Sequence, residues 1–305
     1  MKAVVVDKIV KRYGAKKNAV EALHGISFDV DKGELFGLIG PDGAGKTSLF
    51  RILTTLLLPN EGRATVEGLD VVKDYKAIRK QVGYMPGRFS LYQDLSVEEN
   101  LEFFATIFNT SIEKNFDLIK DIYTQIEPFK DRKAGKLSGG MKQKLALSCA
   151  LIHRPSVLFL DEPTTGVDAV SRKEFWEMLR KLKNEGITIL VSTPYMDEAS
   201  LCDRIALIQD GRLLSIDTPT GVINSFNNSI LAIKSTNMLK LLNDLKSHES
   251  VKDAYPFGEY HHAVMKAGFK QEELKHYLQK QETREVEMME VSANIEDCFI
   301  ALMKS

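Results

Sequence analysis

Short, uninterrupted apolar runs recur along the first two-thirds of the chain, and helical patterns lie between them. Three of these runs cover residues 35–40, 157–160 and 188–192. Continuous apolar runs of about four to eight residues are typical of parallel strands that are buried on both faces. Between the second and third runs, residues 171–183 have the spacing of an amphipathic helix. This alternation predicts an α/β fold built round a parallel sheet.

The pattern differs at both ends of the chain. Residues 1–30 contain a β-branched run and an alternating stretch, which predict strands, and residues 97–153 are mostly helical in pattern. After residue 220 shorter strand and helix patterns follow one another. We expect strands at 231–234, 260–265 and 285–291, and helices at 237–246, 272–281 and 295–303. The sequence therefore predicts two domains, residues 1–220 and a small α+β module at 221–305.

Composition and charge narrow the function classes. Lys plus Arg number 41 and Asp plus Glu 42, a net charge of −1 that argues against a broad nucleic-acid-binding surface. No apolar run approaches the ~20 residues of a membrane-spanning helix, so we expect no integral membrane domain. Cys149, Cys202 and Cys298 are far apart and predict neither disulfides nor a zinc site. His261 and His262 are adjacent, and we expect a surface or half-buried pair facing opposite sides of a strand.

A glycine-rich segment lies directly after the first apolar run and before a helical pattern. It fits the phosphate-loop pattern G-x-x-x-x-G-K-[ST]. Glycines let the backbone wrap closely round phosphate groups, and N–H groups at a helix start attract negative charge. We expect Lys46 to reach the β- and γ-phosphates and the Thr47 hydroxyl to ligate Mg²⁺. The predicted nucleotide-binding residues here are Gly40, Pro41, Asp42, Gly43, Ala44, Gly45, Lys46, Thr47 and Ser48.

Two adjacent carboxylates end the second apolar run. Asp161 would stand at the C-terminal edge of a buried strand, where a carboxylate can hold Mg²⁺ through water. Glu162 follows, and it is our candidate for the residue that polarises the attacking water as a general base. Alone such a pair is weak evidence, but together with the phosphate loop it predicts a MgATP site.

One further segment narrows the family. Leu137–Gln143 reads Leu-Ser-Gly-Gly-Met-Lys-Gln, and its Ser-Gly-Gly opens a helical pattern, which is a second anion-binding helix terminus. Here the sequence resembles the ATP-binding subunit of ABC transporters, whose signature motif this segment matches. The resemblance implies that Leu137, Ser138, Gly139, Gly140 and Gln143 contact ATP bound to a second cassette. It also implies that Asp168 belongs to the D-loop and that Tyr13 stacks on adenine.

The resemblance covers roughly residues 1–220 and implies a fold. That fold has a RecA-like parallel-sheet core, an antiparallel β subdomain and a helical subdomain at about residues 90–153. The module at 221–305 resembles the extension of drug- and polysaccharide-export ATPases. Residues 82–86 and 90–92 resemble the multidrug-efflux branch.

Two positions depart from the family pattern. Gly87 stands where the family has a glutamine that contacts Mg²⁺ and the γ-phosphate region. Pro194 stands where it has a histidine that hydrogen-bonds the γ-phosphate, and proline has neither a side-chain donor nor a backbone N–H. Losing one transition-state donor typically costs roughly 10²–10³ in rate. We interpret the site as a slow, degenerate one that still binds ATP, with neutral drift in a working ATPase as the alternative.

These observations together predict an energy-coupling subunit of an ABC exporter. Its expected partners are a second cassette, identical or from a different ATPase, and a separate membrane permease, with no nucleic acid. The degeneracy favours a different ATPase, and the expected location is the cytoplasmic face of the membrane. Two alternatives remain open: a soluble ABC protein acting on ribosomes or DNA, and a regulatory subunit that binds ATP without hydrolysing it.

Overall fold

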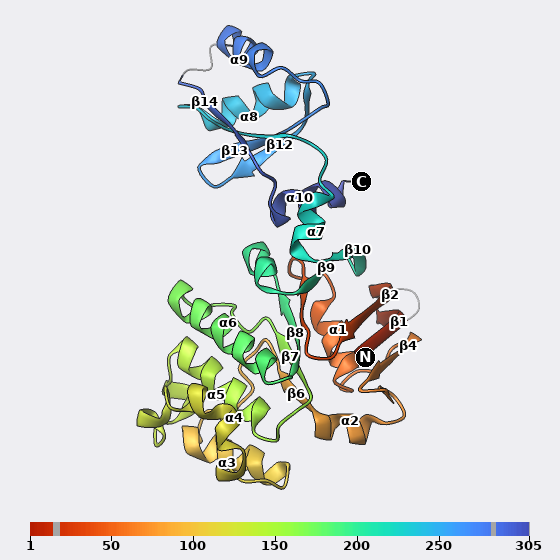
Figure 1. The fold of residues 1–305 in the computed structure, drawn as a ribbon, viewed down its shortest axis with the longest axis vertical. Helices are drawn as coiled ribbons and strands as arrows, with labels where there is room; N and C mark the ends of the chain where they lie inside the picture. Colours follow the sequence, from red (N-terminus) through yellow and green to blue (C-terminus); the bar gives the residue numbers. More distant parts are fainter. Residues whose placement is uncertain (15–18, 282–284, 305) are drawn as a thin grey trace. The chain divides into compact units, whose positions relative to one another are not determined.

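The chain folds into two compact units, Met1–Pro219 and Thr220–Ser305. The computed structural model describes residues 1–14, 19–281 and 285–304 (Figure 1). Each unit has its own sheet and hydrophobic core, and the two are described in turn.

A six-stranded sheet forms the centre of the first unit, in the order β10-β9-β3-β8-β7-β6. All neighbours pair in parallel except β9 and β10, which are antiparallel. Every residue of β3, β7 and β8 is buried, which explains their uninterrupted apolar sequences. The predicted parallel α/β fold is confirmed. The strands are β3 (Leu35–Ile39), β6 (Val82–Met85), β7 (Val157–Asp161), β8 (Thr188–Thr193), β9 (Arg204–Gln209) and β10 (Arg212–Asp217).

A second, four-stranded sheet has the order β2-β1-β4-β5, and its strands come from before and after β3 in the sequence. Its apolar face and the parallel sheet share one core with helix α1 (Lys46–Leu53). Phe50 of α1 packs edge-on against Phe159 of β7, with ring centroids 5.7 Å apart. The antiparallel subdomain that the resemblance implied is therefore present. Its strands are β1 (Lys2–Tyr13), β2 (Val20–Asp31), β4 (Glu61–Val66) and β5 (Leu69–Asp70), and α2 (Tyr75–Gln81) leads from it to β6.

A group of helices, drawn in yellow and green in Figure 1, lies to one side of the parallel sheet. Helices α5 and α6 contact the sheet, and α3 and α4 pack on these two helices. Ser96 caps the first of them and forms a capping box with Glu99, so the local sequence specifies where this helix begins. The stretch 97–153 is mostly helical, as its pattern predicted. The helices are α3 (Val97–Ile107), α4 (Phe116–Tyr123), α5 (Gly139–Leu151) and α6 (Ala169–Asn184).

The second unit is a small α+β domain with an antiparallel sheet in the order β12-β13-β11-β14. Leu231 and Ile233 of its central strand pack with the apolar faces of α8 and α9. His261 and His262 do face opposite ways, but both are buried, so the expectation of a surface or half-buried pair is wrong. Helices cover the sheet where the sequence pattern alone indicated solvent. The elements are α7 (Pro219–Asn224), β11 (Ile230–Lys234), α8 (Met238–Ser247), β12 (Val251–Phe257), β13 (Tyr260–Met265), α9 (Gln271–Lys280), β14 (Glu287–Val291) and α10 (Ile295–Met303).

Within the described part of the chain, no helix is both long enough and apolar enough to cross a membrane.

Candidate nucleotide-binding site

The glycine-rich loop joins the end of β3 to the start of α1. Gly45 is the residue before the helix and has φ = 100°, a conformation that disfavours residues with a Cβ. A Cβ at Gly45 would stand 2.5 Å from the carbonyl oxygen of Ala22, and one at Gly40 only 2.1 Å from that of Ile208. Neighbouring strands therefore require glycine at both ends of the loop. Thr47 and Ser48 are half-buried in the first turn of α1.

Lys46 lies folded into this loop with only 2% of its surface exposed. Its Nζ donates hydrogen bonds to the carbonyl oxygens of Gly40, at 2.7 Å, and Pro41, at 2.9 Å. Its charge partner is Glu162, whose Oε1 lies 3.1 Å away. A buried ammonium needs a counter-charge, and a bound phosphate would supply one at the same place.

The two carboxylates lie where the sequence predicted, at the C-terminal end of β7. Asp161 is 1% exposed and accepts one hydrogen bond, from the hydroxyl of Ser192 on the neighbouring strand β8, at 2.6 Å. Glu162 has φ = 52°, unusual for a residue with a side chain. Its N–H donates to both the carbonyl oxygen and the hydroxyl of Ser192. Ser192 thus positions both acids. Sequence reasoning missed this role, because Ser192 lies 31 residues after Asp161 and 30 after Glu162.

Tyr13 comes from the end of β1 and reaches the same region. Its hydroxyl is 3.0 Å from the Ser48 hydroxyl, and 41% of the residue is exposed. The ring is also within 5.2 Å of the Lys11 ammonium. An exposed aromatic side chain beside the phosphate loop has the placement that the adenine-stacking prediction requires.

Of the two departures from the family pattern, Gly87 lies beside the two acids and Pro194 lies beside the phosphate loop. A Cβ at Gly87 would stand 3.0 Å from the carbonyl oxygen of Asp161 and 3.7 Å from the Cβ of Glu162. Pro194 follows Thr193, whose carbonyl oxygen accepts a hydrogen bond from the Gly40 N–H at 3.2 Å. The positions without donors are therefore directly adjacent to the acids and to the lysine loop.

A buried carboxylate holds the Pro194 segment in place, and sequence reasoning did not single it out. Glu198 is 1% exposed and accepts hydrogen bonds from the hydroxyls of Thr164 and Thr193. Arg172 of α6 pairs with the same carboxylate at 3.2 Å and lies over the ring of Tyr195 at 4.4 Å. This network ties the loop after β7, the end of β8 and α6 to one another.

The signature segment lies apart from the phosphate loop, at the start of α5. Ser138 caps that helix by accepting from the Met141 N–H, and both Ser138 and Gly139 are exposed. Leu137 is buried, and Gln143 is half-buried one turn into the helix. A Cβ at Gly140 would meet the Ser171 hydroxyl at 2.9 Å, so the segment packs against the start of α6. Asp168 caps α6 by accepting from the N–H groups of Val170 and Ser171.

Comparison with known proteins decides the family. The profile of the ABC transporter family matches residues 23–165, which run from before the phosphate loop to just beyond Glu162. A daunorubicin resistance ATP-binding protein of Streptomyces coeruleorubidus is 41% identical over 234 residues, 73% of this chain and 69% of that protein. The chain belongs to the ABC transporter ATP-binding family. The resemblance inferred from the signature segment is confirmed.

Other relatives and solved structures agree with this assignment. A probable multidrug ABC transporter ATP-binding protein of Escherichia coli is 37% identical over 98% of this chain, which spans 52% of that protein's length. A solved ATP-binding subunit of an ABC transporter is 26% identical with TM-score 0.66, covering 73% of this chain and 93% of its own. A dimeric cassette bound to ADP and phosphate has TM-score 0.65 at 25% identity, covering 70% and 98%. The predicted ABC-cassette fold is confirmed.

The residues of this cassette suit Mg²⁺ only in the presence of a nucleotide. Among the described residues no group of three or more His, Cys, Asp or Glu side chains gathers to hold a metal. Asp161 accepts a single hydrogen bond, so oxygen lone pairs remain for a metal or its water ligands. Thr47 and Asp161 would hold the ion together with phosphate oxygens, which is usual for Mg²⁺.

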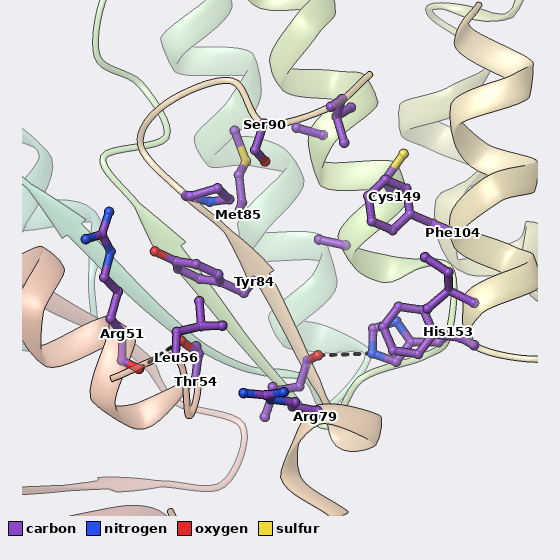
Figure 2. Close-up of a pocket in the computed structure, with 17 residues that line it drawn as sticks. Arg51, Thr54, Leu56, Arg79, Tyr84, Met85, Ser90, Phe104, Cys149 and His153 are labelled. Atoms are coloured by element: carbon purple, nitrogen blue, oxygen red, sulfur yellow. Dashed lines mark hydrogen bonds between the residues drawn. The ribbon is translucent and has the colours of Figure 1, made fainter. Parts of the chain in front are cut away.

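The cassette also has an apolar groove of about 580 Å³ beside β6. Figure 2 shows Tyr84 and Met85 between Arg51 on one side and Phe104, Cys149 and His153 on the other. Leu56 and Ile107 line it and are 56% and 57% exposed. Arg51 and Arg79 are its charged side chains, and no carboxylate is among the residues that line it. Contiguous exposed apolar surface marks a contact with a protein or a membrane, or a ligand-binding groove.

Proposed function

We propose that this chain is the MgATP-binding, energy-coupling subunit of an ABC exporter. The single observation that supports this best is the ion pair between buried Lys46 of the phosphate loop and half-buried Glu162, which directly follows buried Asp161. Relatives with 37–41% identity are named as multidrug, daunorubicin-resistance and Nod-factor-export ATP-binding proteins, which supports export. In this proposal the chain lies at the cytoplasmic face of a membrane through a permease partner.

The roles of the residues follow from their positions. Bound Mg²⁺ would make the γ-phosphate of ATP more electrophilic. The residues of this chain would bind and orient the nucleotide. Lys46 binds the β- and γ-phosphates, Thr47 and Asp161 hold Mg²⁺, and Glu162 orients and deprotonates water. Tyr13 stacks on the base. The exposed Ser138 and its neighbours complete the site of a second cassette, because they lie away from their own phosphate loop.

The chain's own site is proposed to be slow. Neither Gly87 nor Pro194 has a side-chain donor to stabilise charge on the transferring phosphoryl group. The site therefore binds ATP but turns it over poorly, whereas the signature segment can still serve a different ATPase subunit. A subunit that binds ATP without hydrolysis is the second candidate function, and the same two residues favour it.

Turnover measurements test this part of the proposal. Wild-type ATPase activity should be close to that of Glu162→Gln, and Gly87→Gln combined with Pro194→His should raise it by at least roughly tenfold. A Cβ at Gly87 is crowded by Asp161, so Gly87→Ala with Pro194→His is the control that separates crowding from the restored amide. Brisk wild-type turnover that the restoration does not change would contradict the slow-site proposal.

The groove beside β6 is proposed to dock the permease. Its exposed apolar rim and its position directly before Gly87 support a route from the membrane subunit to the nucleotide. Leu56→Asp should reduce the amount of chain retained on membranes of its own cells, because it places a charge on the apolar rim. Leu239→Asp on α8, a leucine outside the groove that is 73% exposed against 56% for Leu56, should have no effect. Equal retention of both variants would contradict docking at this groove.

A further inference from the structure

The turn after α1 contains a residue in a strained conformation. Thr55 has φ = 64°, in the left-handed region that β-branched residues rarely adopt. Its N–H donates to the Ile52 carbonyl oxygen at 3.0 Å. The next N–H, of Leu56, donates to the Arg51 carbonyl oxygen at 2.7 Å. This pair of bonds is the Schellman motif, whose left-handed position is usually glycine, so the local geometry favours glycine where the chain has threonine.

The threonine side chain has a partner that glycine could not bind. Arg79 of α2 donates from Nε to the Thr55 hydroxyl at 2.8 Å and from Nη2 to the Thr55 carbonyl oxygen at 2.9 Å. The same guanidinium lies over the ring of Tyr75, 5.3 Å from its centroid. Strained backbone conformations cluster at functional sites, where the surrounding structure maintains them. The strain at Thr55 is therefore associated with a guanidinium that is held in one place.

This guanidinium belongs to the groove beside β6. Arg79 lines the groove, and Figure 2 shows it at the same end as Leu56. Arg79 is exposed and makes no ion pair among the described residues. The two N–H groups that bind Thr55 leave other N–H groups of the guanidinium unused. Since the described residues that line the groove include no carboxylate, a counter-charge has to come from the molecule that docks there.

We propose that Arg79 is a pre-organised anchor for a carboxylate of the permease segment that docks in this groove. That segment has an apolar face, which matches the apolar lining, and an acidic side chain that meets Arg79. Arginine binds carboxylates through paired, charge-assisted hydrogen bonds, and a side chain held in advance loses less entropy on binding. Thr55 is a positioning residue, because it acts through Arg79. This inference rests on the proposed docking of the permease at the groove.

The test measures binding of the purified full chain to inside-out vesicles of its own cells, stripped of peripheral proteins, at increasing salt. Arg79→Ala should weaken binding at low salt roughly tenfold and make it less sensitive to salt, because a charge-assisted contact is lost. Arg79→Lys keeps the charge but not the paired geometry, so its effect should be intermediate.

Thr55→Gly separates docking from stability. Glycine adopts the left-handed conformation without strain, so the midpoint of thermal unfolding should not fall. Binding should nevertheless weaken roughly threefold, because Arg79 loses the hydroxyl that holds it. The matched control is Lys80→Ala, which removes the same charge from an exposed neighbour on α2 that does not line the groove, and it should bind like the wild type.

Arg79→Ala or Thr55→Gly binding as tightly as the wild type would overturn the role of Arg79, while weaker binding of Leu56→Asp would keep the docking proposal. Equally tight binding of the wild type to vesicles of the extracted lipids alone would assign the ligand of Arg79 to lipid head groups and overturn the carboxylate. If Leu56→Asp bound like the wild type, the proposed docking itself would fail and the inference with it.

Discussion

Each unit of this protein contains one almost fully buried aspartate, and the two differ in how well their oxygens are satisfied. Asp161 in the cassette is 1% exposed and accepts one hydrogen bond, from Ser192. Asp297 in the C-terminal unit is 0% exposed and accepts three. Tyr255 and His262 donate to its Oδ1 at 2.8 and 2.7 Å, and the Asn294 N–H donates to its Oδ2 at 2.9 Å.

We interpret Asp161 as a binding group and Asp297 as a structural one. A buried carboxylate with free lone pairs is costly unless something else binds it, and Asp161 is followed directly by Glu162, which pairs with Lys46 of the phosphate loop. Both carboxylate oxygens of Asp297 already accept hydrogen bonds, from donors on β12, β13 and the cap of α10. Asp297 fixes α10 onto the sheet. The following predictions test this contrast, from the largest expected effect to the smallest.

Asp161→Asn should lose most of the Mg²⁺-dependent gain in AMP-PNP affinity, roughly 100-fold, because the metal loses a charged ligand. The free energy of unfolding of the cassette should change by less than about 1 kcal/mol, since asparagine can still accept from Ser192. Titrations with and without Mg²⁺, together with urea unfolding, measure both. Unchanged metal dependence in a destabilised cassette would make Asp161 structural, like Asp297.

Asp297→Ala should destabilise the C-terminal unit by about 3 kcal/mol, because it leaves two buried side-chain donors unsatisfied. Hydrogen exchange in β12 and β13 measures the loss. Nucleotide affinity should not change. Glu296→Ala, an exposed acid one residue earlier, is the control and should have little effect. A fall in nucleotide affinity with Asp297→Ala would remove the contrast between the two aspartates.

Tyr255→Phe should cost the C-terminal unit about 1 kcal/mol, the usual contribution of one hydrogen bond. Burial, and then the hydrogen bond to Asp297, raise the pKa of Tyr255. The native unit therefore resists ionisation of this phenol, and its stability should fall as the pH rises above the ordinary pKa of tyrosine, about 10. Hydrogen exchange compared at neutral and alkaline pH, with allowance for the intrinsic rate, checks this. A phenylalanine variant as stable as the wild type would mean that Tyr255 does not hold Asp297.

The smallest expected effect is at Tyr84, whose pKa responds to the charge of Asp161. Burial, and then the negative charge of Asp161, raise its pKa to about 12. Its contribution is fully present below pH 10 and is lost as the pH rises towards 12, on the order of 1 kcal/mol after allowance for its partial exposure. Tyr84→Phe should flatten the alkaline decline of cassette stability measured by urea unfolding. An identical decline in both proteins would assign it to other groups.

Prediction from sequence succeeded where the information is contiguous. The segments at residues 40–48, 137–143 and 161–162 each lie within one turn or strand end, so spacing along the chain specified their local geometry. It failed for Ser192, whose partners are 30 or more residues away along the chain. It also failed for Glu198, whose partners Thr164, Thr193 and Arg172 come from three separate segments. Strand β6 is only four residues long and was not predicted, yet it leads to Gly87 and borders the groove.

The sequence by itself therefore determined the class of fold, the family and the candidate phosphate, metal and signature residues. It did so because periodicity and motif spacing are local properties of a chain. Tertiary structure decided that Lys46 pairs with Glu162 and that Gly87 lies beside the main-chain carbonyl of Asp161. It also decided that Asp297 is satisfied while Asp161 is not. Those contacts join strands and loops far apart in sequence, and only the packing of one sheet against its neighbours brings them together.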